Sequence, residues 1–292
     1  MSESQQPRMS MHRRVAQGIR NDIEAGRLRD GERLPSTREL AAQWEVSVFT
    51  ISEAVKLLVE DGFVTSKARS GRVVTTPADV RQRLLTADPE RPARPQVVLV
   101  GGWPGSGKSE FSRVLARMTG WALLDKDTIA RPIIEPALED LGSTFDDRES
   151  DIYLTRIRPR EYEALDAVIR DNVQCGNSCI GSAPYLREFN DQNWLENVEA
   201  RFNEDQADVT FVWVRCTLET MHMYLRRRGA ARDRWKLANW DEHSRQIDLE
   251  FRPLLPHVVI DNDPDSKPLH MQARRLAENL ARQAAVTADP KS

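Results

Sequence analysis

Long apolar runs are missing from this 292-residue sequence. A membrane-spanning helix needs about 20 consecutive apolar residues, and no segment approaches that length. The first residues, 1–14, are polar and lack the apolar centre of a secretory signal peptide. We therefore expect a cytoplasmic protein that does not bind a membrane. The apolar share of 40% and the charged share of 30% are typical of an ordinary folded protein.

Cysteine and net charge are also scarce. The three cysteines, Cys175, Cys179 and Cys216, are too few for a disulfide framework and fit a reducing compartment. No second Cys or His pair follows Cys175 and Cys179 closely, so a zinc site is not expected. The formal net charge of −3 excludes a generally basic surface for nucleic acid. Any DNA binding must then depend on a local motif and a local basic patch.

The length and the pattern predict two folded domains. Residues 9–76 contain short amphipathic helices and end in two strand-like segments. Residues 77–95 are rich in Pro, Arg and Asp, as is typical of a linker. Residues 96–286 alternate apolar strands with helices, which predicts an α/β domain of three layers, with a parallel sheet between helices. Its expected strands are 96–102, 121–127, 178–184, 209–216 and 257–263.

Two short helices joined by a tight turn are predicted between residues 34 and 60. Ser36 and Glu39 have the spacing of a capping box at the start of the first helix. Ser47 is the expected N-cap of the second helix. This is the helix-turn-helix pattern, in which the second helix enters the major groove of DNA.

A basic hairpin is predicted after these helices. Residues 63–64 and 72–75 are the expected strands, and the turn between them contains Lys67, Arg69 and Gly71. Together with Arg72, the two basic side chains of the turn give the hairpin a cationic tip suited to DNA phosphates. The N-terminal domain is therefore expected to be a winged helix-turn-helix that binds double-stranded DNA.

These motifs resemble the DNA-binding domain of the GntR family over roughly the first quarter of the chain. The resemblance is carried by GERLPSTRELA (31–41), VSVFTISEAVKLL (46–58), DGFV (61–64) and SGRVV (70–74). It implies that Arg38, Ser47 and Thr50 contact DNA and that Gly71 lets the wing approach the minor groove. It also implies a homodimer on a palindromic operator.

The sequence departs from the GntR pattern in the second helix. Val48 and Ser52 stand where the family often carries arginine. The loss of these cations predicts weaker binding or a different operator. A winged helix used for protein contacts is the alternative interpretation of the domain.

The segment GWPGSGKS at 102–109 matches the phosphate-loop pattern G-x-x-x-x-G-K-[ST] in full. An apolar strand precedes it and a predicted helix, 110–118, follows it. The backbone N–H groups of such a loop surround phosphate oxygens, while Lys108 meets the β- and γ-phosphate charge and Ser109 can bind Mg²⁺. The expected nucleotide contacts are Gly105, Ser106, Gly107, Lys108, Ser109 and Glu110. ATP is the expected nucleotide, because the guanine signature N-K-x-D is absent.

Two carboxylates, Asp125 and Asp127, end the next predicted strand. The carboxyl ends of parallel strands face the ligand crevice, so these side chains are expected beside the nucleotide. One can orient a Mg²⁺-bound water, and the other can accept the proton of an attacking hydroxyl or hold that hydroxyl in line. We assign Asp125 to the metal with Ser109, and Asp127 to catalysis. Two solvated surface acids are the alternative.

A basic, Gly-containing segment, 226–236, follows the fourth predicted strand and its helix. At this point of a P-loop protein, it predicts a lid that closes over phosphates, with Arg228 and Arg232 neutralising charge on the transferred phosphoryl group. An exposed basic helix face and a patch that contacts DNA are the two other interpretations.

The second domain resembles the group of P-loop kinases that includes zeta toxins, shikimate kinase and gluconate kinase, and the related AAA-type ATPases. The loop at 102–109, the two aspartates and the basic segment carry this resemblance, with a stretch at 147–162. It implies that Asp127 is the partner of a substrate hydroxyl and that Arg131 and Arg158 hold the substrate. Ser182 departs from the pattern, since many P-loop proteins place a Mg²⁺-holding aspartate at the end of that strand.

Three functions remain open on the sequence alone. The chain can be a transcription regulator whose P-loop domain senses ATP, a related nucleotide or a small-molecule effector. It can be a working small-molecule kinase or weak ATPase that also carries a DNA-binding module. It can be a zeta-like toxin kinase with a regulatory head. The first is the preferred interpretation, because a DNA reader joined to a ligand domain is a switch architecture.

Overall fold

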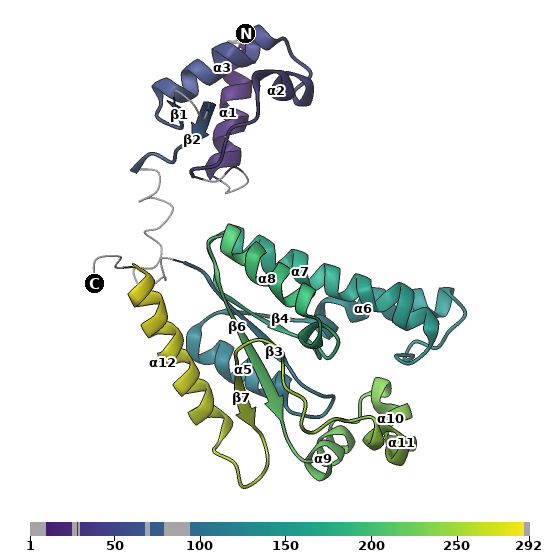
Figure 1. Cartoon of the computed structure of the whole chain (residues 1–292). Coiled ribbons are helices and arrows are strands. Elements are labelled where there is room, and N and C mark those ends of the chain that lie inside the picture. Colours follow the sequence, from purple (N-terminus) through teal and green to yellow (C-terminus); the bar gives the residue numbers. More distant parts are fainter. Residues whose placement is uncertain (1–9, 25–27, 29, 68–70, 79–93, 289–292) are drawn as a thin grey trace, which may run out of the picture. The chain divides into compact units, whose positions relative to one another are not determined.

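A computed structural model of the chain describes residues 10–24, 28, 30–67, 71–78 and 94–288 (Figure 1). The chain divides into two compact units, Met1–Arg91 and Pro92–Ser292. Across the described residues, every helix is too short or too polar to span a bilayer. The expected domain limits of 9–76, 77–95 and 96–286 stay predictions, and residues 79–93 of the expected linker lie outside the described residues.

The N-terminal unit is a winged helix. Its elements are α1 (Met11–Glu24), α2 (Thr37–Gln43), α3 (Val48–Glu60), β1 (Val64–Lys67) and β2 (Gly71–Val74). Val15 and Ile19 lie one turn apart on the same face of α1. They are buried in one cluster with Ile51 and Leu58 of α3, and this cluster is the core of the unit. The predicted helix-turn-helix is thus present as α2 and α3.

Both predicted N-caps of this unit are confirmed. The main-chain N–H of Ser36 donates to Glu39 Oε2 at 2.7 Å, and the N–H of Glu39 donates to Ser36 Oγ at 3.3 Å, which completes the capping box. The N–H of Thr50 donates to Ser47 Oγ at 3.1 Å at the start of α3. These caps fix where α2 and α3 begin, and so which residues their N-terminal turns present.

The predicted hairpin is also confirmed. Strands β1 and β2 pair antiparallel from Val64 opposite Val74 to Lys67 opposite Gly71. Gly71 has a φ of +76°, a left-handed backbone conformation that glycine adopts without strain. Arg69 lies outside the described residues, and Lys67 is placed by its backbone alone.

The C-terminal unit is built on a five-stranded parallel sheet, and all five predicted strands are present. They are β3 (Gln96–Gly101), β4 (Ala122–Asp125), β5 (Cys179–Ser182), β6 (Asp208–Arg215) and β7 (His257–Asp261). Their order across the sheet is β4-β5-β3-β6-β7. The chain enters the sheet at its centre and crosses first to one side and then to the other. The loops at the carboxyl ends of the strands therefore gather beside β3.

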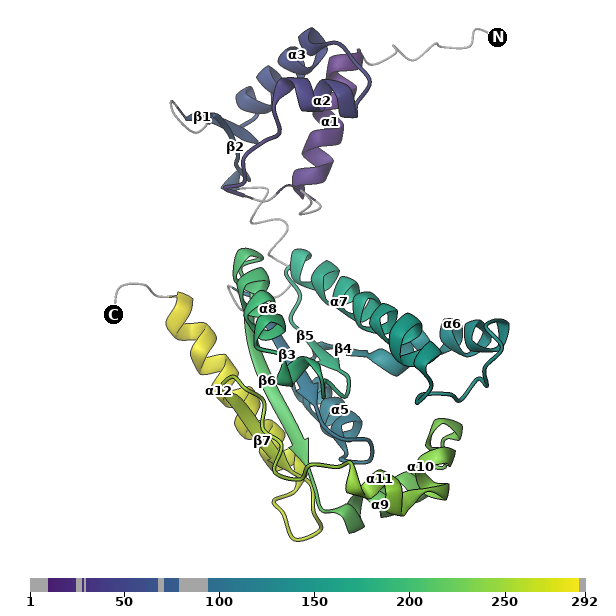
Figure 2. The same ribbon diagram turned by 45° about the vertical axis from the view of Figure 1, so that its right-hand side comes forward.

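Helices cover both faces of this sheet (Figure 2). Val98 and Val100 of β3 pack with α5 (Lys108–Thr119) and α12 (Leu269–Ala288) on one face. Val97 and Leu99 pack with α7 (Arg158–Gln174) and α8 (Gln192–Glu204) on the other. The alternation of side chains along a strand thus gives the expected three-layer α/β/α arrangement.

The remaining elements lie around the carboxyl ends of the strands. Helix α6 (Lys126–Asp140) packs on α7, and a π-helical turn, η1 (Tyr153–Ile157), leads into α7. The short turn η2 (Glu188–Asn190) follows β5. After β6 come α9 (Leu218–Arg228), η3 (Ala231–Asp233), α10 (Arg234–Ala238) and α11 (Trp240–Arg245).

Candidate functional site

The phosphate-binding loop joins β3 to α5 and depends on two glycines. Gly105 and Gly107 have φ angles of +86° and +89°, which residues with side chains rarely adopt. A Cβ atom on Gly105 would lie 2.8 Å from the main-chain oxygen of Met221, and one on Gly107 would lie 1.9 Å from Asn262 Nδ2. The same Asn262 nitrogen donates to the main-chain oxygen of Ser106 at 3.0 Å and holds the loop in place. Backbone conformation and space thus both require glycine at these two positions.

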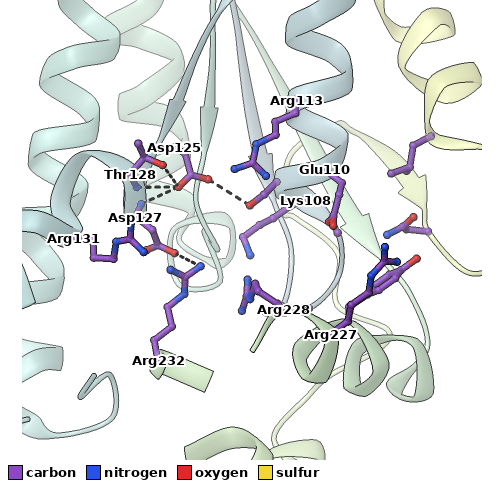
Figure 3. Close-up of a pocket in the computed structure, with 16 residues that line it drawn as sticks. Lys108, Glu110, Arg113, Asp125, Asp127, Thr128, Arg131, Arg227, Arg228 and Arg232 are labelled. Carbon is purple, nitrogen blue, oxygen red and sulfur yellow. Dashed lines mark hydrogen bonds and ion pairs between the residues drawn. The ribbon is translucent and has the colours of Figure 1, made fainter. Parts of the chain in front are cut away.

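A pocket of about 640 Å³ lies in front of this loop (Figure 3). It brings together the loop and α5, the junction of β4 with α6, and the end of α9 with the residues that follow it. The expected site residues that line it are Gly105, Gly107, Lys108, Ser109, Glu110, Asp125, Asp127, Arg131, Arg228 and Arg232. Since ligand pockets usually occupy roughly 300–1,000 Å³, this one has room for a nucleotide.

Two expected site residues lie outside this lining. Ser106 is buried beneath the loop, and its Oγ has no hydrogen-bond partner among the described atoms. Arg158 stands at the start of α7, where its Nη1 lies 2.9 Å from Glu188 Oε1 and its guanidinium lies 4.4 Å from the ring centre of Tyr162. Arg158 instead lines a neighbouring, smaller pocket, and its substrate role stays a prediction.

Ser109 and Asp125 are the candidate metal residues. Ser109 Oγ donates to Asp125 Oδ2 at 3.4 Å, so the two oxygens that would hold Mg²⁺ lie side by side. The other carboxylate oxygen, Oδ1, caps α6 by accepting from the N–H groups of Asp127 and Thr128, both at 3.1 Å. Asp125 is thereby held in a fixed orientation with one oxygen directed to Ser109.

Ser182 occupies the position next to Asp125 across the sheet, since β4 and β5 pair Asp125 with Ser182. Its Oγ is buried and has no hydrogen-bond partner among the described atoms. Among the described residues, no group of three His, Cys, Asp or Glu side chains is arranged to hold an ion on its own. The donor set fits Mg²⁺ that arrives with phosphate oxygens and waters, which is how Mg²⁺ is usually bound.

Asp127 lies between two cations. Its Oδ1 lies 3.1 Å from Lys126 Nζ, and its Oδ2 lies 3.2 Å from Arg232 Nη2. Burial alone would raise the pKa of Asp127, but the charges of Lys126, Arg232 and Lys108 outweigh burial and hold this pKa well below its usual range. Asp127 is therefore a carboxylate at neutral pH and a weak base.

Lys108 is the cation of the phosphate loop. Burial, reinforced by the charges of Arg228 and Arg232, lowers the pKa of Lys108 to about 8, although Asp127 and Asp125 act in the opposite direction. A phosphate group beside Lys108 would favour its charged form and raise this pKa again. The site is therefore arranged to hold an anion at Lys108.

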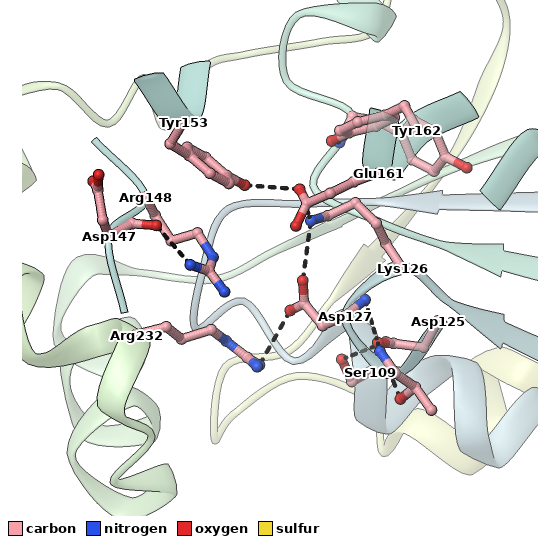
Figure 4. A network of polar contacts seen from close by, with 12 residues as sticks. Ser109, Asp125, Lys126, Asp127, Asp147, Arg148, Tyr153, Glu161, Tyr162 and Arg232 are labelled. Atoms are coloured by element: carbon pink, nitrogen blue, oxygen red, sulfur yellow. Dashed lines mark hydrogen bonds and ion pairs between the residues drawn. The ribbon is translucent and has the colours of Figure 1, made fainter. Parts of the chain in front are cut away.

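A buried polar network supports the site from behind (Figure 4). Lys126 and Glu161 are only 4% and 2% exposed, and they form an ion pair. Tyr153 OH donates to Glu161 Oε2 at 2.8 Å, and burial raises the pKa of Tyr153 far above its usual value. Lys126 thus connects Asp127 at the pocket to the π-helical turn and α7. The sequence reasoning passed over Lys126 and Glu161; the only available signal was a lysine between two functional aspartates.

The basic segment after β6 lies along the pocket, at the place where the sequence predicts a lid. Arg228 ends α9 and binds Asp233 through two hydrogen bonds, Nε to Oδ2 at 2.8 Å and Nη2 to Oδ1 at 2.7 Å. Asp233 is 2% exposed, so the pair anchors η3 to α9. Arg232, in η3, extends to Asp127. Of the three sequence interpretations of this segment, its lining of the pocket favours the lid.

The expected DNA-contacting residues lie on the two helices and the wing of the N-terminal unit. Arg38 is in the first turn of α2, while Ser47 and Thr50 are at the start of α3, where their hydroxyl oxygens are 2.8 Å apart. Arg72 is in β2, next to Gly71. DNA contact by these residues stays a prediction.

An apolar feature of α3 escaped the sequence reasoning. Val48 and Phe49, in its first turn, are 49% and 73% exposed. These are the residues that a recognition helix presents to base edges. Ser52, one turn later, turns back and donates to the main-chain oxygen of Val48 at 2.9 Å. The signal available in the sequence was the phase of the helix, which places Phe49 opposite the buried Ile51 and Leu58.

Comparison with known proteins agrees with this division. The model for bacterial regulatory proteins of the gntR family matches residues 11–74, and the AAA domain model matches residues 97–249. The HTH-type transcriptional regulator TauR of Rhodobacter capsulatus is 38% identical over 69 residues, which are 24% of this chain and 14% of that protein. The cytidylate kinase of Azotobacter vinelandii is 29% identical over 110 residues, which are 32% of this chain and 48% of that protein.

Among solved structures, a candidate kinase from Chloroflexus aurantiacus is similar to the C-terminal unit. It is 20% identical, and the match covers 64% of this chain and 96% of that one, with a TM-score of 0.49. The chain spans less than half the length of each of the two curated relatives above. With the AAA domain model matching more than half of its residues, this chain belongs to the AAA domain family, as a kinase-like P-loop domain that follows a gntR-type winged helix.

Proposed function

We propose that this chain is a DNA-binding transcription regulator whose C-terminal P-loop domain binds Mg-ATP and acts as its ligand-responsive effector domain. The N-terminal unit would bind a palindromic operator as a homodimer through α3 and the wing. The observation that carries the ATP part is the loop itself, in which two left-handed glycines and Lys108 line a pocket of about 640 Å³.

The pocket supports a nucleotide triphosphate through three kinds of group. Loop N–H groups at the start of α5 would donate to the phosphates, since the first turn of a helix leaves these donors unpaired. Lys108 offers a positive charge to the phosphates. Its pKa is lowered to about 8 in the site without a ligand, and a bound anion would raise it again. Ser109 and Asp125 would hold Mg²⁺, which would offset the negative charge of the phosphates.

The N-terminal unit supports operator binding through its capped second helix. Ser47 fixes the start of α3, so Thr50 and the exposed Phe49 are presented together at the tip of the helix. Phe49 suits the methyl groups of thymine in the major groove. Arg38 and Arg72 would contact phosphates and bases beside it.

A second candidate function is phosphoryl transfer to a small hydroxyl compound, and the Asp127–Arg232 pair favours it. These residues stand opposite Lys108 in the same pocket, where a γ-phosphate and an acceptor hydroxyl would meet. The low pKa of Asp127 suits it to orient the hydroxyl rather than to remove its proton early. This is sufficient chemically, because the transition state of phosphoryl transfer is loose.

One experiment separates the two functions. The full-length protein is used to enrich binding sites from a random DNA library, and its affinity for the enriched site is measured without nucleotide and with Mg-ATP. Lys108→Ala serves as the control, and ADP release is followed in the same samples. An affinity that changes with Mg-ATP in the wild type alone, with ADP at background, supports the regulator.

The other outcomes are equally informative. Steady ADP release, together with a DNA affinity that is the same with and without Mg-ATP, would show that the chain acts primarily as an enzyme. Enrichment of no DNA sequence by a protein that still binds ATP would reject the operator part of the proposal and leave the P-loop part standing.

A further inference from the structure

A second pocket, of about 270 Å³, adjoins the nucleotide pocket. Lys108, Asp127, Arg228 and Arg232 line both, so the two pockets meet at these four side chains. The second pocket extends from them to the stretch before η1 and to α7, α10 and α11. A volume just below the usual range of roughly 300–1,000 Å³ fits a small molecule rather than a peptide.

Positive charge exceeds negative charge around this second pocket. Eight lysines and arginines line it, but only three carboxylates do. Five of the eight cations form ion pairs with carboxylates: Lys126, Arg158, Arg228, Arg232 and Lys236. Within the described part of the chain, Lys108, Arg148 and Arg187 have no such pair. Lys108 belongs to the phosphate loop, which leaves two arginines for a second ligand.

Uncharged groups hold the side chain of Arg148 in place. Its Nη1 donates to the main-chain oxygens of Phe145 at 3.3 Å and Asp147 at 2.6 Å, and its guanidinium lies 5.2 Å from the ring centre of Tyr153. These contacts fix the side chain without neutralising it. Arg187, exposed, lies at the rim beside Leu186. An arginine in this state favours a carboxylate or a phosphate, which its planar donor groups can bind in pairs.

His243 supplies an independent sign of a ligand. It is 6% exposed, it lines the second pocket, and its Nε2 has no hydrogen-bond partner among the described atoms. Buried polar atoms without partners are rare and costly, so each calls for a missing partner. Burial and the nearby charge of Lys236 lower the pKa of His243, so its ring is neutral near pH 7. A neutral imidazole nitrogen can donate to, or accept from, a ligand hydroxyl.

We propose that this second pocket binds a small hydroxylated anion, with its carboxylate or phosphate on Arg148 and Arg187 and a hydroxyl on His243. Another hydroxyl of the same molecule would lie at Asp127, facing the nucleotide. The inference rests on the proposed function, because it places this ligand beside a bound nucleotide. The ligand is then the effector of a regulator or the phosphoryl acceptor of a kinase.

If the ligand is an acceptor, the transfer balances with residues already in place. The hydroxyl oxygen at Asp127 bonds to the γ-phosphorus as the bond from that phosphorus to the β–γ bridging oxygen breaks. ADP leaves with the electron pair of the broken bond. The hydroxyl proton passes to solvent.

Ligand binding tests the inference on the full-length protein saturated with Mg²⁺ and a non-hydrolysable ATP analogue, so that the phosphate loop is filled. Probes are matched sets that share a three-carbon, six-carbon or aromatic scaffold and bear a neutral, a carboxylate or a phosphate group. Inorganic phosphate is the smallest probe. Binding is measured by calorimetry for the wild type, for Arg148→Gln with Arg187→Gln, and for His243→Asn. Arg156→Gln is the control, because this exposed arginine of η1 does not line the pocket.

We expect anionic probes to bind at least about tenfold more tightly than the neutral member of their set, which is the effect of one charge-assisted hydrogen bond. The arginine variant should lose this difference and keep its affinity for the ATP analogue, while Arg156→Gln changes neither. Within each set, the member that binds more tightly, carboxylate or phosphate, identifies the anion. Equal binding of neutral probes, anion binding that survives the arginine variant, or no anion binding up to about 10 mM would each overturn the proposal. Failure of the wild-type protein to bind the ATP analogue would instead count against the proposed function.

Discussion

Arg232 Nη2 lies 3.2 Å from Asp127 Oδ2, and this contact joins the lid segment to the first turn of α6. Both side chains line the nucleotide pocket, together with Lys108 of the phosphate loop. A γ-phosphate beside Lys108 would compete with Asp127 for Arg232, because both are anions. We therefore expect occupancy of the pocket to change the contact between this segment and α6.

We expect Arg232→Gln to weaken ATP binding by about tenfold to one hundredfold and to leave ADP binding nearly unchanged. The loss corresponds to one hydrogen bond to a charged group, of about 1.5–3 kcal/mol. Calorimetric titration with ATP and ADP in Mg²⁺ measures it. Arg226→Gln, an exposed position of the same segment outside the pocket lining, should change neither affinity. Equal losses for ATP and ADP would place Arg232 away from the γ-phosphate.

Nucleotide affinity should depend on pH through Lys108. The charged form binds phosphate, and burial lowers the pKa of this lysine to about 8 in the free site. Below pH 8 the full charge is present; above it, binding must also take up a proton, so affinity should fall by about tenfold for each pH unit. Titrations from pH 7 to 9.5 measure this slope. Lys108→Arg keeps its charge at all these pH values and should flatten it, and a wild type that is already flat would refute the assignment.

Gly107→Ala should abolish nucleotide binding and destabilise the C-terminal unit. The new Cβ would lie 1.9 Å from Asn262 Nδ2, and φ is +89°. Gly142→Ala is the matched control, because Gly142 has a φ of +80° but nothing within 4 Å of the added Cβ. Both variants should lose roughly 1–2 kcal/mol from the left-handed backbone, and only Gly107→Ala should lose more. Urea unfolding and nucleotide titration compare the two; identical losses with binding retained would mean that the loop can open around a side chain.

The buried pair of Lys126 and Glu161 should matter more to stability than its exposed counterparts. Lys126→Met leaves Glu161 buried without its cation, which should cost about 3–5 kcal/mol of unfolding free energy. The double variant Lys126→Met with Glu161→Gln removes both charges and should recover a large part of the loss. Arg160→Gln breaks an exposed pair with Glu163 and should cost less than about 1 kcal/mol. Denaturant unfolding of the three proteins distinguishes a structural pair from a surface one.

Local sequence patterns were sufficient for most of the fold. The caps at Ser36 and Ser47 and the five strands follow from spacing over a few residues, and the structure confirms them. The loop at 102–109 was recognisable because glycine allows the left-handed backbone that Gly105 and Gly107 adopt. What joins distant parts of the chain was beyond such patterns. Arg158 was expected at the substrate, and it pairs with Glu188 of η2, thirty residues along the chain.

The candidate site was predictable to the same extent. Asp125 and Asp127 were identified because strand ends meet at one edge of a parallel sheet. Arg148 and His243 were not, since they reach the second pocket from the stretch before η1 and from α11, about a hundred residues apart. No periodicity in the sequence encodes that meeting. The exposure of Phe49 was only partly predictable from the sequence. The helical phase indicates it, but only the packed core of α1 and α3 establishes it.

Phe49→Ala should weaken operator binding without destabilising the winged helix. The side chain is 73% exposed, so its removal should change unfolding free energy by less than about 0.5 kcal/mol. Affinity for the enriched DNA site should fall by about fivefold or more, as for the loss of one base-pair contact. Uracil in place of thymine should weaken the wild type at one position and leave Phe49→Ala unaffected there, because the thymine methyl is the expected contact. Val59→Ala, at the other end of α3 and 41% exposed, is the control. An unchanged affinity of Phe49→Ala would instead assign this apolar tip to contact with another protein.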